Sequence, residues 1–199
     1  QNSLFLALVL TMLAGILLGM GLPTTPAYIV QVALLVPALV KLGVTVEAAH
    51  LFVLYFAVLS AITPPVAMAV YAANGISGAT LMETSWASVK LGLTGYIIPF
   101  MFVSAPSLLL IGDPFDVTLA ALTASIGVIC LAGGLHEHFF LGRARWWERL
   151  LLIAAALVLI TPGWMTDLIG LVLIGVVCAS QLAGRRADRA HAATVADRG

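Results

Sequence analysis

Long apolar runs, each of helical length, follow one another through most of this chain, and almost all of its charges fall between them. Of 199 residues, 62% are hydrophobic and 9% are charged, whereas a soluble domain carries roughly 25% charged residues. The runs are too long for the strands of an outer-membrane barrel and lack their alternation, so the spans should be helical. The sequence therefore predicts an all-α integral membrane protein.

Two short polar breaks interrupt the apolar runs in the first part of the chain. Residues 19–26 read GMGLPTTP, and residues 60–65 read SAITPP. In lipid every backbone polar group needs a partner, so irregular backbone at membrane depth survives only where it is buried in protein or lines a cavity. Paired interruptions of this kind point to the binding site of a transporter. We interpret the two breaks as one site for an ion and a substrate.

The apolar runs around these breaks predict a helical hairpin followed by a discontinuous helix. Residues 4–18 would form a helix of ~22 Å, short of the roughly 30 Å hydrocarbon core, and residues 27–40 are also too short to cross alone. A re-entrant hairpin over residues 4–40 fits these lengths, and a single broken spanning helix is the alternative. Residues 48–74 then predict the discontinuous helix, interrupted at the second break.

Beyond residue 74 the chain alternates between polar turns and further apolar runs. Residues 77–90 mix apolar and polar side chains and predict a short interfacial helix with Trp86 at headgroup depth. Residues 91–111 predict a membrane span, and residues 113–183 predict additional transmembrane helices. The Arg-rich tail over residues 184–199 is expected to be disordered.

Arginine clusters lie on both sides of the last predicted helical hairpin. The positive-inside rule assigns both clusters, and with them the C-terminus, to the cytoplasm. Counting back through the spans, if residues 4–40 form a re-entrant hairpin, both of its ends face the outside and its tip dips toward the middle of the membrane. The clusters consist of Arg143, Arg145, Arg149, Arg185, Arg186 and Arg189.

Charge and cysteine usage exclude some partners. The net charge of zero argues against nucleic acid. Cys130 and Cys178 lie inside apolar runs and are expected to be buried free thiols. The chain begins at Gln1 and shows no cleavable signal peptide, so we expect it to be the C-terminal part of a longer polypeptide.

Proline explains how the breaks could bind a cation. Proline has no N–H and clashes with the carbonyl four residues back, so that carbonyl loses its helical partner. The freed oxygens would lie at the C-terminal ends of half-helices, where the dipole places partial negative charge. With the hydroxyls of Thr24, Thr25, Ser60 and Thr63 they would form a set of uncharged donors that suits sodium, and no carboxylate is present to demand a divalent ion. The carbonyls are those of Gly19, Leu22, Ser60 and Ala61, opposite Pro23, Pro26, Pro64 and Pro65.

The same breaks could also bind an anion. The half-helices that begin near Ala27 and Val66 would point free N–H groups into the region of the cation. Helix N-termini attract anions, and a substrate carboxylate is the natural guest. Carbonyls for a cation and amides for an anion are what sodium-coupled carboxylate uptake requires.

The remaining polar residues in apolar surroundings have simpler interpretations. Gln31 and Asn74 are expected to make interhelical hydrogen bonds rather than to act as ligands. His136-Glu137-His138 is superficially like a metal site, but residues one or two apart do not share a helix face, so a solvated loop is expected.

The residues at the two breaks carry a family resemblance. GMGLPTTPAY at 19–28 and SAITPPV at 60–66 resemble the second repeat of the large membrane subunit of TRAP (tripartite ATP-independent periplasmic) transporters, and the resemblance covers residues 4–112. It implies an elevator-type transporter with inverted repeats, in which residues 1–112 form the second repeat. It also implies sodium sites between a hairpin tip and a broken helix. The helices after Phe115 go beyond the usual large subunit and suggest the variant in which the small and large subunits are fused.

Carried over by position, the resemblance implies a sodium site between the hairpin tip and the broken helix. No cofactor and no other metal is expected. The implied partners are a periplasmic binding protein that delivers an organic acid, the small-subunit helices, the missing N-terminal repeat and the bilayer. The expected sodium-binding residues are Gly19, Gly21, Thr24, Thr25, Ser60, Thr63 and Pro64, and the expected substrate-binding residues are Thr25, Ala27, Pro65 and Val66.

The sequence thus predicts sodium-coupled import of an organic acid across a bacterial inner membrane rather than an enzyme. Another ion-coupled anion carrier that works without a binding protein is the alternative. An intramembrane enzyme is disfavoured, because the deep hydroxyls have no histidine or carboxylate near them in sequence. A non-transporting scaffold would not require paired polar breaks.

Overall fold

The computed structural model describes residues 2–136, 138–139, 142–160 and 164–196. The chain forms two compact units, residues 1–117 and residues 118–199. Its described elements are helical apart from a two-residue antiparallel pair, β1 (His138–Phe139) and β2 (Gly142–Arg143). The predicted all-α class is therefore confirmed.

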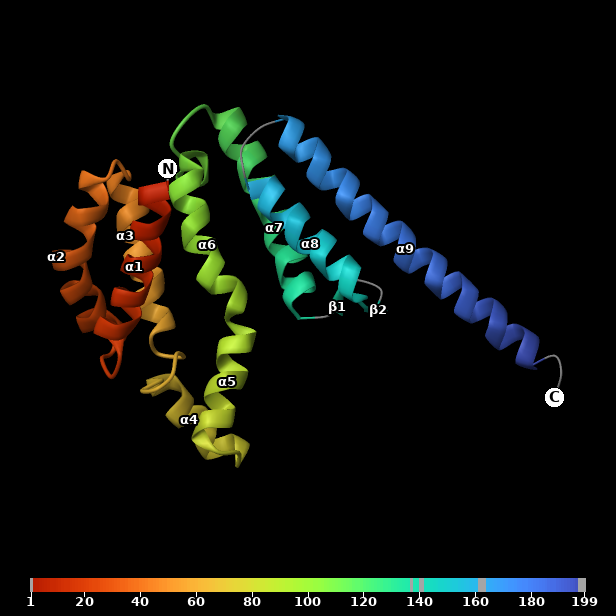
Figure 1. Cartoon of the computed structure of the whole chain (residues 1–199), viewed down its shortest axis with the longest axis horizontal. Coiled ribbons are helices and arrows are strands. Elements are labelled where there is room, and N and C mark those ends of the chain that lie inside the picture. Colours follow the sequence, from red (N-terminus) through yellow and green to blue (C-terminus); the bar gives the residue numbers. More distant parts are fainter. Residues whose placement is uncertain (1, 137, 140–141, 161–163, 197–199) are drawn as a thin grey trace. The chain divides into compact units, whose positions relative to one another are not determined.

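The first unit begins with a helical hairpin. Helices α1 (Asn2–Gly19) and α2 (Thr24–Lys41) pack against each other and run in opposite directions (Figure 1). The tip between them turns at Gly21, whose φ of 76° lies in the left-handed region that glycine adopts without strain. Residues 4–40 therefore form a helical hairpin whose two helices fold back on each other, and the expectation that its second arm is too short to cross a membrane is wrong, because α2 has 18 residues.

Helix α3 (Val46–Leu59) forms the centre of this unit, with α1, α2 and α6 (Leu93–Ser104) packed around it. The Phe52 and Phe56 side chains of α3 are fully buried. Phe100 of α6 meets both rings edge-on, with ring centroids 5.2 Å from Phe52 and 6.3 Å from Phe56. Edge-on aromatic pairs of this kind add to the free energy gained by burial. The short helix α3 is thus held on several sides.

The chain leaves α3 through residues 60–67, which include the second break, and continues into α4 (Met68–Ser77) and α5 (Leu81–Leu91). A capping box fixes the start of α5: the Glu83 N–H donates to Thr80 Oγ1, and the Thr80 N–H donates to Glu83 Oε2 at 3.0 Å. The hairpin tip and the second break lie at the same end of the unit, close to α4 and α5 (Figure 1).

The span predicted over residues 91–111 is wrong as a single helix. The chain bends by 41° between α5 and α6, with Gly92 at the junction. Helix α6 then ends at Ser104, because proline at 106 disfavours the helical conformation of Ala105, and a 3-10 turn, η1 (Pro106–Leu109), follows. Because this stretch is mostly apolar, its composition did not indicate the bend at Gly92 or the end of α6 at Ser104.

The second unit contains most of α7 (Pro114–Leu135), together with α8 (Trp146–Ile160) and α9 (Trp164–Ala196). Helices α8 and α9 pack closely, and a Cβ on Gly170 of α9 would lie 2.7 Å from Leu159 Cδ2 of α8. Both cysteines are free, as predicted. The predicted disorder of the tail is wrong for residues 184–196, which continue α9; alanine and arginine are frequent there, and both have high helix propensity.

Three described helices are long and apolar enough to cross a membrane: α2, α7 and residues 165–182 of α9. The bent pair α5 and α6 would add a fourth span if it crosses as one unit. The apolar stretches Leu4–Gly19 of α1 and Val46–Leu59, which is α3, are shorter. Large apolar side chains are exposed along these helices, among them Phe5 and Leu17 on α1. Such surfaces suit contact with lipid or with other membrane helices.

Candidate functional site

Backbone hydrogen bonds hold the tip of the α1–α2 hairpin in a compact turn. The Leu22 N–H donates to the Gly19 carbonyl at 3.2 Å, and the Ala27 N–H donates to the Pro23 carbonyl at 3.1 Å. Thr24 and Thr25 lie in the first turn of α2 and are exposed, whereas Ala27 is fully buried. The backbone amide of Ala27, which we expected to be free, is therefore already engaged.

The second break continues α3 as a series of tight turns. Backbone N–H groups of residues 61–63 each donate three residues back, ending with Thr63 N–H to the Ser60 carbonyl at 3.3 Å. The Ala69 N–H of α4 then donates to the Ala61 carbonyl at 2.9 Å. This bond joins the two half-helices across the break.

These bonds correct one expectation about the prolines. The carbonyls of Gly19, Ser60 and Ala61 lose their helical partners but each accepts a hydrogen bond from another backbone N–H. A carbonyl oxygen has two lone pairs, so each of these oxygens keeps one for a further partner. The break therefore offers carbonyls that are half satisfied rather than bare.

The tip and the break are in direct contact at Gly19. A Cβ placed on Gly19 would lie 2.8 Å from Ser60 Cβ and 3.0 Å from Gln31 Nε2. A Cβ on Gly21 would lie 3.4 Å from Val66 Cγ1. The structure thus brings together predicted site residues from both breaks, and it does so through two glycines that allow the close approach.

The Thr63 hydroxyl is occupied on both sides. Thr63 Oγ1 donates to the Leu59 carbonyl at 2.6 Å and lies 2.6 Å from Tyr96 Oη of α6. Because threonine has one hydroxyl proton, Tyr96 is the donor in the second bond. Ser60 is similarly engaged, since its Oγ donates to the Ala57 carbonyl at 2.7 Å. Both hydroxyls retain acceptor capacity only.

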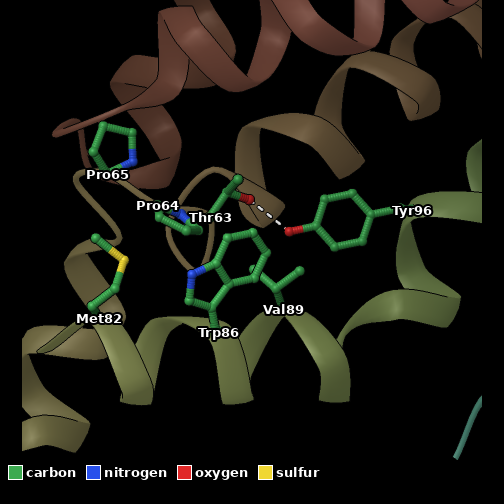
Figure 2. Close-up of a pocket in the computed structure, with 7 residues that line it drawn as sticks. All are labelled: Thr63, Pro64, Pro65, Met82, Trp86, Val89 and Tyr96. Carbon is green, nitrogen blue, oxygen red and sulfur yellow. Dashed lines mark hydrogen bonds between the residues drawn. The ribbon is translucent and has the colours of Figure 1, made fainter. Parts of the chain in front are cut away.

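A pocket of about 590 Å³ opens beside the second break. In Figure 2 the side chains of α5 face the loop that carries the prolines, and Tyr96 reaches in from α6 toward Thr63. The walls are apolar apart from the two hydroxyls and the Trp86 indole, and the volume is within the usual range of small-molecule sites. The lining residues are Thr63, Pro64, Pro65, Met82, Trp86, Val89 and Tyr96.

Of the predicted interhelical hydrogen bonds, one is formed and one is not. The Thr84 hydroxyl of α5 donates to Asn74 Oδ1 of α4 at 3.0 Å, as expected. Gln31 is fully buried, yet both of its side-chain amide atoms lack a hydrogen-bond partner within the described part of the chain. Neither Gln31 nor Tyr96 is among the site residues expected from the sequence. A lone polar residue in an apolar run was the available signal for Gln31.

Neither break contains a charged side chain that could bind a metal ion. Within the described ranges, no three histidine, cysteine, aspartate or glutamate side chains lie close enough to hold a metal ion. Glu137 of the His136-Glu137-His138 segment lies outside those ranges.

Helices α8 and α9 meet at one buried carboxylate, Glu148. Glu148 Oε2 accepts from the Arg145 N–H at 2.9 Å, and Oε1 accepts from Ser180 Oγ at 2.6 Å. Burial raises the pKa of this carboxyl, but these hydrogen bonds outweigh that effect, so the pKa of Glu148 lies below its usual value. The carboxylate caps the first turn of α8 and ties it to α9.

Comparison with models of protein families gives two adjoining matches. Residues 1–113 match the DctM component of the tripartite ATP-independent periplasmic transporters. Residues 117–172 match a domain of unknown function, DUF3394. No curated protein and no solved structure matches the chain. The first match spans more than half of the chain and includes the hairpin, both breaks and the pocket. The chain therefore belongs to the family of the DctM component, the large permease subunit of the TRAP transporters.

Proposed function

We propose that this chain is the C-terminal part of a sodium-coupled importer of an organic acid, with its cation site where the hairpin tip meets the second break. The observation that carries the proposal is the close approach of Gly19 to Ser60, which brings the C-terminal ends of α1 and α3 together. Helix C-termini carry partial negative charge, and carbonyls at such ends bind Na⁺ in other secondary transporters. Family membership supports a transport role, with a periplasmic binding protein and a small subunit as general partners.

The proposed cation ligands are neutral oxygens from both breaks. The half-satisfied carbonyls of Gly19 and Ser60 contribute first, because these two residues meet at the contact and each carbonyl keeps one lone pair. The exposed hydroxyls of Thr24 and Thr25 contribute from the first turn of α2. Thr63 contributes least, because its hydroxyl already bonds Leu59 and Tyr96. Gly21 and Pro64 complete the proposed set.

The organic acid is proposed to bind beside the cation, with its body in the pocket of Figure 2. Pro65 lines this pocket and Val66 contacts the hairpin tip, so the two proposed substrate residues of the break bridge pocket and tip. Thr25, near the N-terminus of α2, would supply a positive helix end for the carboxylate. Ala27 supports this turn through packing, because its N–H is engaged.

The hydroxyls of α2 provide the first test. In the full-length permease with its partners, Thr24→Val with Thr25→Val should raise the sodium concentration for half-maximal uptake roughly tenfold, since losing ~1.4 kcal/mol of ion binding changes affinity by that factor. Uptake of labelled organic acid against sodium concentration measures the effect.

Two controls accompany this test. Thr123→Val on α7 removes a hydroxyl whose hydrogen bonds, among the described residues, go to the Leu119 and Ala120 carbonyls of its own helix, and it should leave the sodium curve unchanged. Tyr96→Phe removes the bond to Thr63 without removing the Thr63 oxygen. Unchanged sodium dependence in the Thr24/Thr25 variant would remove these residues from the site. Uptake by liposomes without any binding protein would favour the alternative carrier.

The pocket supplies a second prediction. Val89 is half-buried on the wall formed by α5, and Val89→Trp should fill the pocket and raise the KM for the organic acid roughly tenfold or more, because ~1.4 kcal/mol of lost substrate binding corresponds to that factor. The matched control is Leu91→Trp on the same helix, at a position that is 75% exposed. Equal KM values for both variants would show that substrate does not enter this pocket.

A further inference from the structure

We propose that Gln31 of α2 is a direct ligand of the transported cation, with its side-chain carbonyl completing the set of oxygens at the contact between Gly19 and Ser60. This inference rests on the proposed function and adds a residue to its site. It assigns a role to a side chain that the packing of the hairpin otherwise leaves without a partner.

Burial gives the first reason. Gln31 is fully buried, and neither its Oε1 nor its Nε2 has a hydrogen-bond partner among the described residues. Leaving both ends of a buried amide unpaired is costly, and a ligand bound beside the amide would offset that cost. An apolar residue of similar size would fill the same space without that cost.

The helix opposite Gln31 is shaped to receive it. Gly15 and Gly19 are four residues apart on α1 and therefore share one face. A Cβ on Gly15 would lie 3.0 Å from Gln31 Oε1, and a Cβ on Gly19 would lie 3.0 Å from Gln31 Nε2. The two glycines thus allow the amide group to lie against the backbone of α1. A half-turn about the last bond of the side chain exchanges Oε1 and Nε2, so the oxygen can face either glycine.

The surrounding charge favours a cation at this amide. Helix α1 ends at Gly19 and α3 ends at Leu59, next to the buried Ser60, so two negative helix ends lie beside the amide. The Gly19 and Ser60 carbonyls each keep one lone pair after their backbone hydrogen bonds. A glutamine oxygen is a hard neutral donor of the same kind as these carbonyls. The three oxygens come from the tip, from α2 and from the break.

The test removes the oxygen while keeping the shape. Gln31→Met in the full-length permease should raise the sodium concentration for half-maximal uptake at least tenfold. In detergent without sodium the variant should unfold at the same temperature as the wild type or higher, because an unpaired amide has been removed. The rise in unfolding temperature that sodium causes in the wild type should be lost.

Gln181→Met on α9 is the matched control, because it makes the same substitution outside the DctM match, at a side chain that lies beside Glu148. It should leave both sodium responses unchanged. If Gln31→Met does not fold, the Gln31→Glu variant replaces it in the test. Gln31→Glu keeps an oxygen at the same position, so sodium should still raise its unfolding temperature. Loss of that sodium-induced stabilisation would overturn the proposal.

The outcomes separate this inference from the proposed function. Unchanged sodium responses in Gln31→Met, with weakened responses in the Thr24/Thr25 variant, overturn the role of Gln31 and leave the sodium site standing. Loss of sodium responses in Gln181→Met as well as in Gln31→Met overturns the role of Gln31 as a ligand. A wild-type permease whose uptake and stability do not respond to sodium overturns both.

Discussion

Gly19→Ala should abolish most transport, because the added methyl group has no space at the contact between the tip and the break. Its Cβ would lie 2.8 Å from Ser60 Cβ and 3.0 Å from Gln31 Nε2, and Ser60 cannot move away as the end of a long side chain could. Overpacking of this kind costs about 1–3 kcal/mol. The hairpin should shift off the break, and uptake at limiting sodium should fall roughly tenfold or more. Uptake assays and thermal unfolding of the purified permease measure the two effects.

A matched glycine and a second-site change make this prediction specific. Gly75→Ala in α4 adds the same methyl group where no atom lies within 4 Å of the new Cβ, and it should be neutral or slightly stabilising. Ser60→Gly removes the two Ser60 atoms that lie nearest the new methyl group and leaves only Gln31 Nε2 close to it, so the double variant should recover most of the lost unfolding temperature. A Gly19→Ala protein as stable and active as the Gly75→Ala protein would mean that the tip and the break are not in close contact.

Glu148→Ala should destabilise the second unit by about 2 kcal/mol, because a charged hydrogen bond contributes about 1.5–3 kcal/mol and a helix cap about 1 kcal/mol. Glu83→Ala is the matched control. Glu83 Oε2 also accepts a hydrogen bond at the start of its helix, from the Thr80 N–H at 3.0 Å, but the Glu83 side chain is exposed. The Glu83→Ala variant should therefore lose only the stabilisation that the helix cap provides. Chemical unfolding followed by tryptophan fluorescence measures both, with Trp146 and Trp147 of α8 as reporters of the second unit and Trp86 of α5 as the reporter of the first.

The same carboxylate gives a pH signature with a definite sign. Hydrogen bonds from Ser180 and the Arg145 N–H hold the pKa of Glu148 below its usual value despite burial, which raises it. A depressed folded-state pKa stabilises the fold above the unfolded-state pKa of about 4.3, and that stabilisation is lost as the pH falls through the lower folded-state value. The wild type should therefore lose more stability than Glu148→Gln between pH 6 and pH 3, as judged by unfolding temperature. Parallel curves would contradict the assigned role of Glu148.

Much of the fold follows from local signals in the sequence. The length of the apolar runs fixed the helical class, and the glycines and prolines at residues 19–26 and 60–65 marked both breaks. The meeting of the two breaks was implied by family resemblance, and the approach of Gly19 to Ser60 fits it. The breaks can be predicted from the sequence because proline and glycine change the conformation of the backbone at their own positions.

What the sequence did not reveal depends on contacts between distant residues. Tyr96 lies 33 residues from Thr63, and nothing in either segment indicates that their hydroxyls bond. The alternative partners of the proline-released carbonyls depend on the exact path of each turn. The end of α6 is a different case, because Pro106 does indicate in the sequence that the helix stops. The apolar residues around Pro106 favoured a continuous span instead.

The contact between tip and break has one electrical consequence. None of the side chains from Gly19 to Thr25, or from Ser60 to Val66, is ionisable. An ion held by these residues alone would keep its whole charge, because these two stretches supply no ionised side chain as a countercharge. A membrane voltage of 100 mV, negative inside, is worth ~2.3 kcal/mol for each such charge. One ion with a monovalent acid would cross without sensing the voltage, and every additional ion would let the cell's voltage draw the loaded carrier inward.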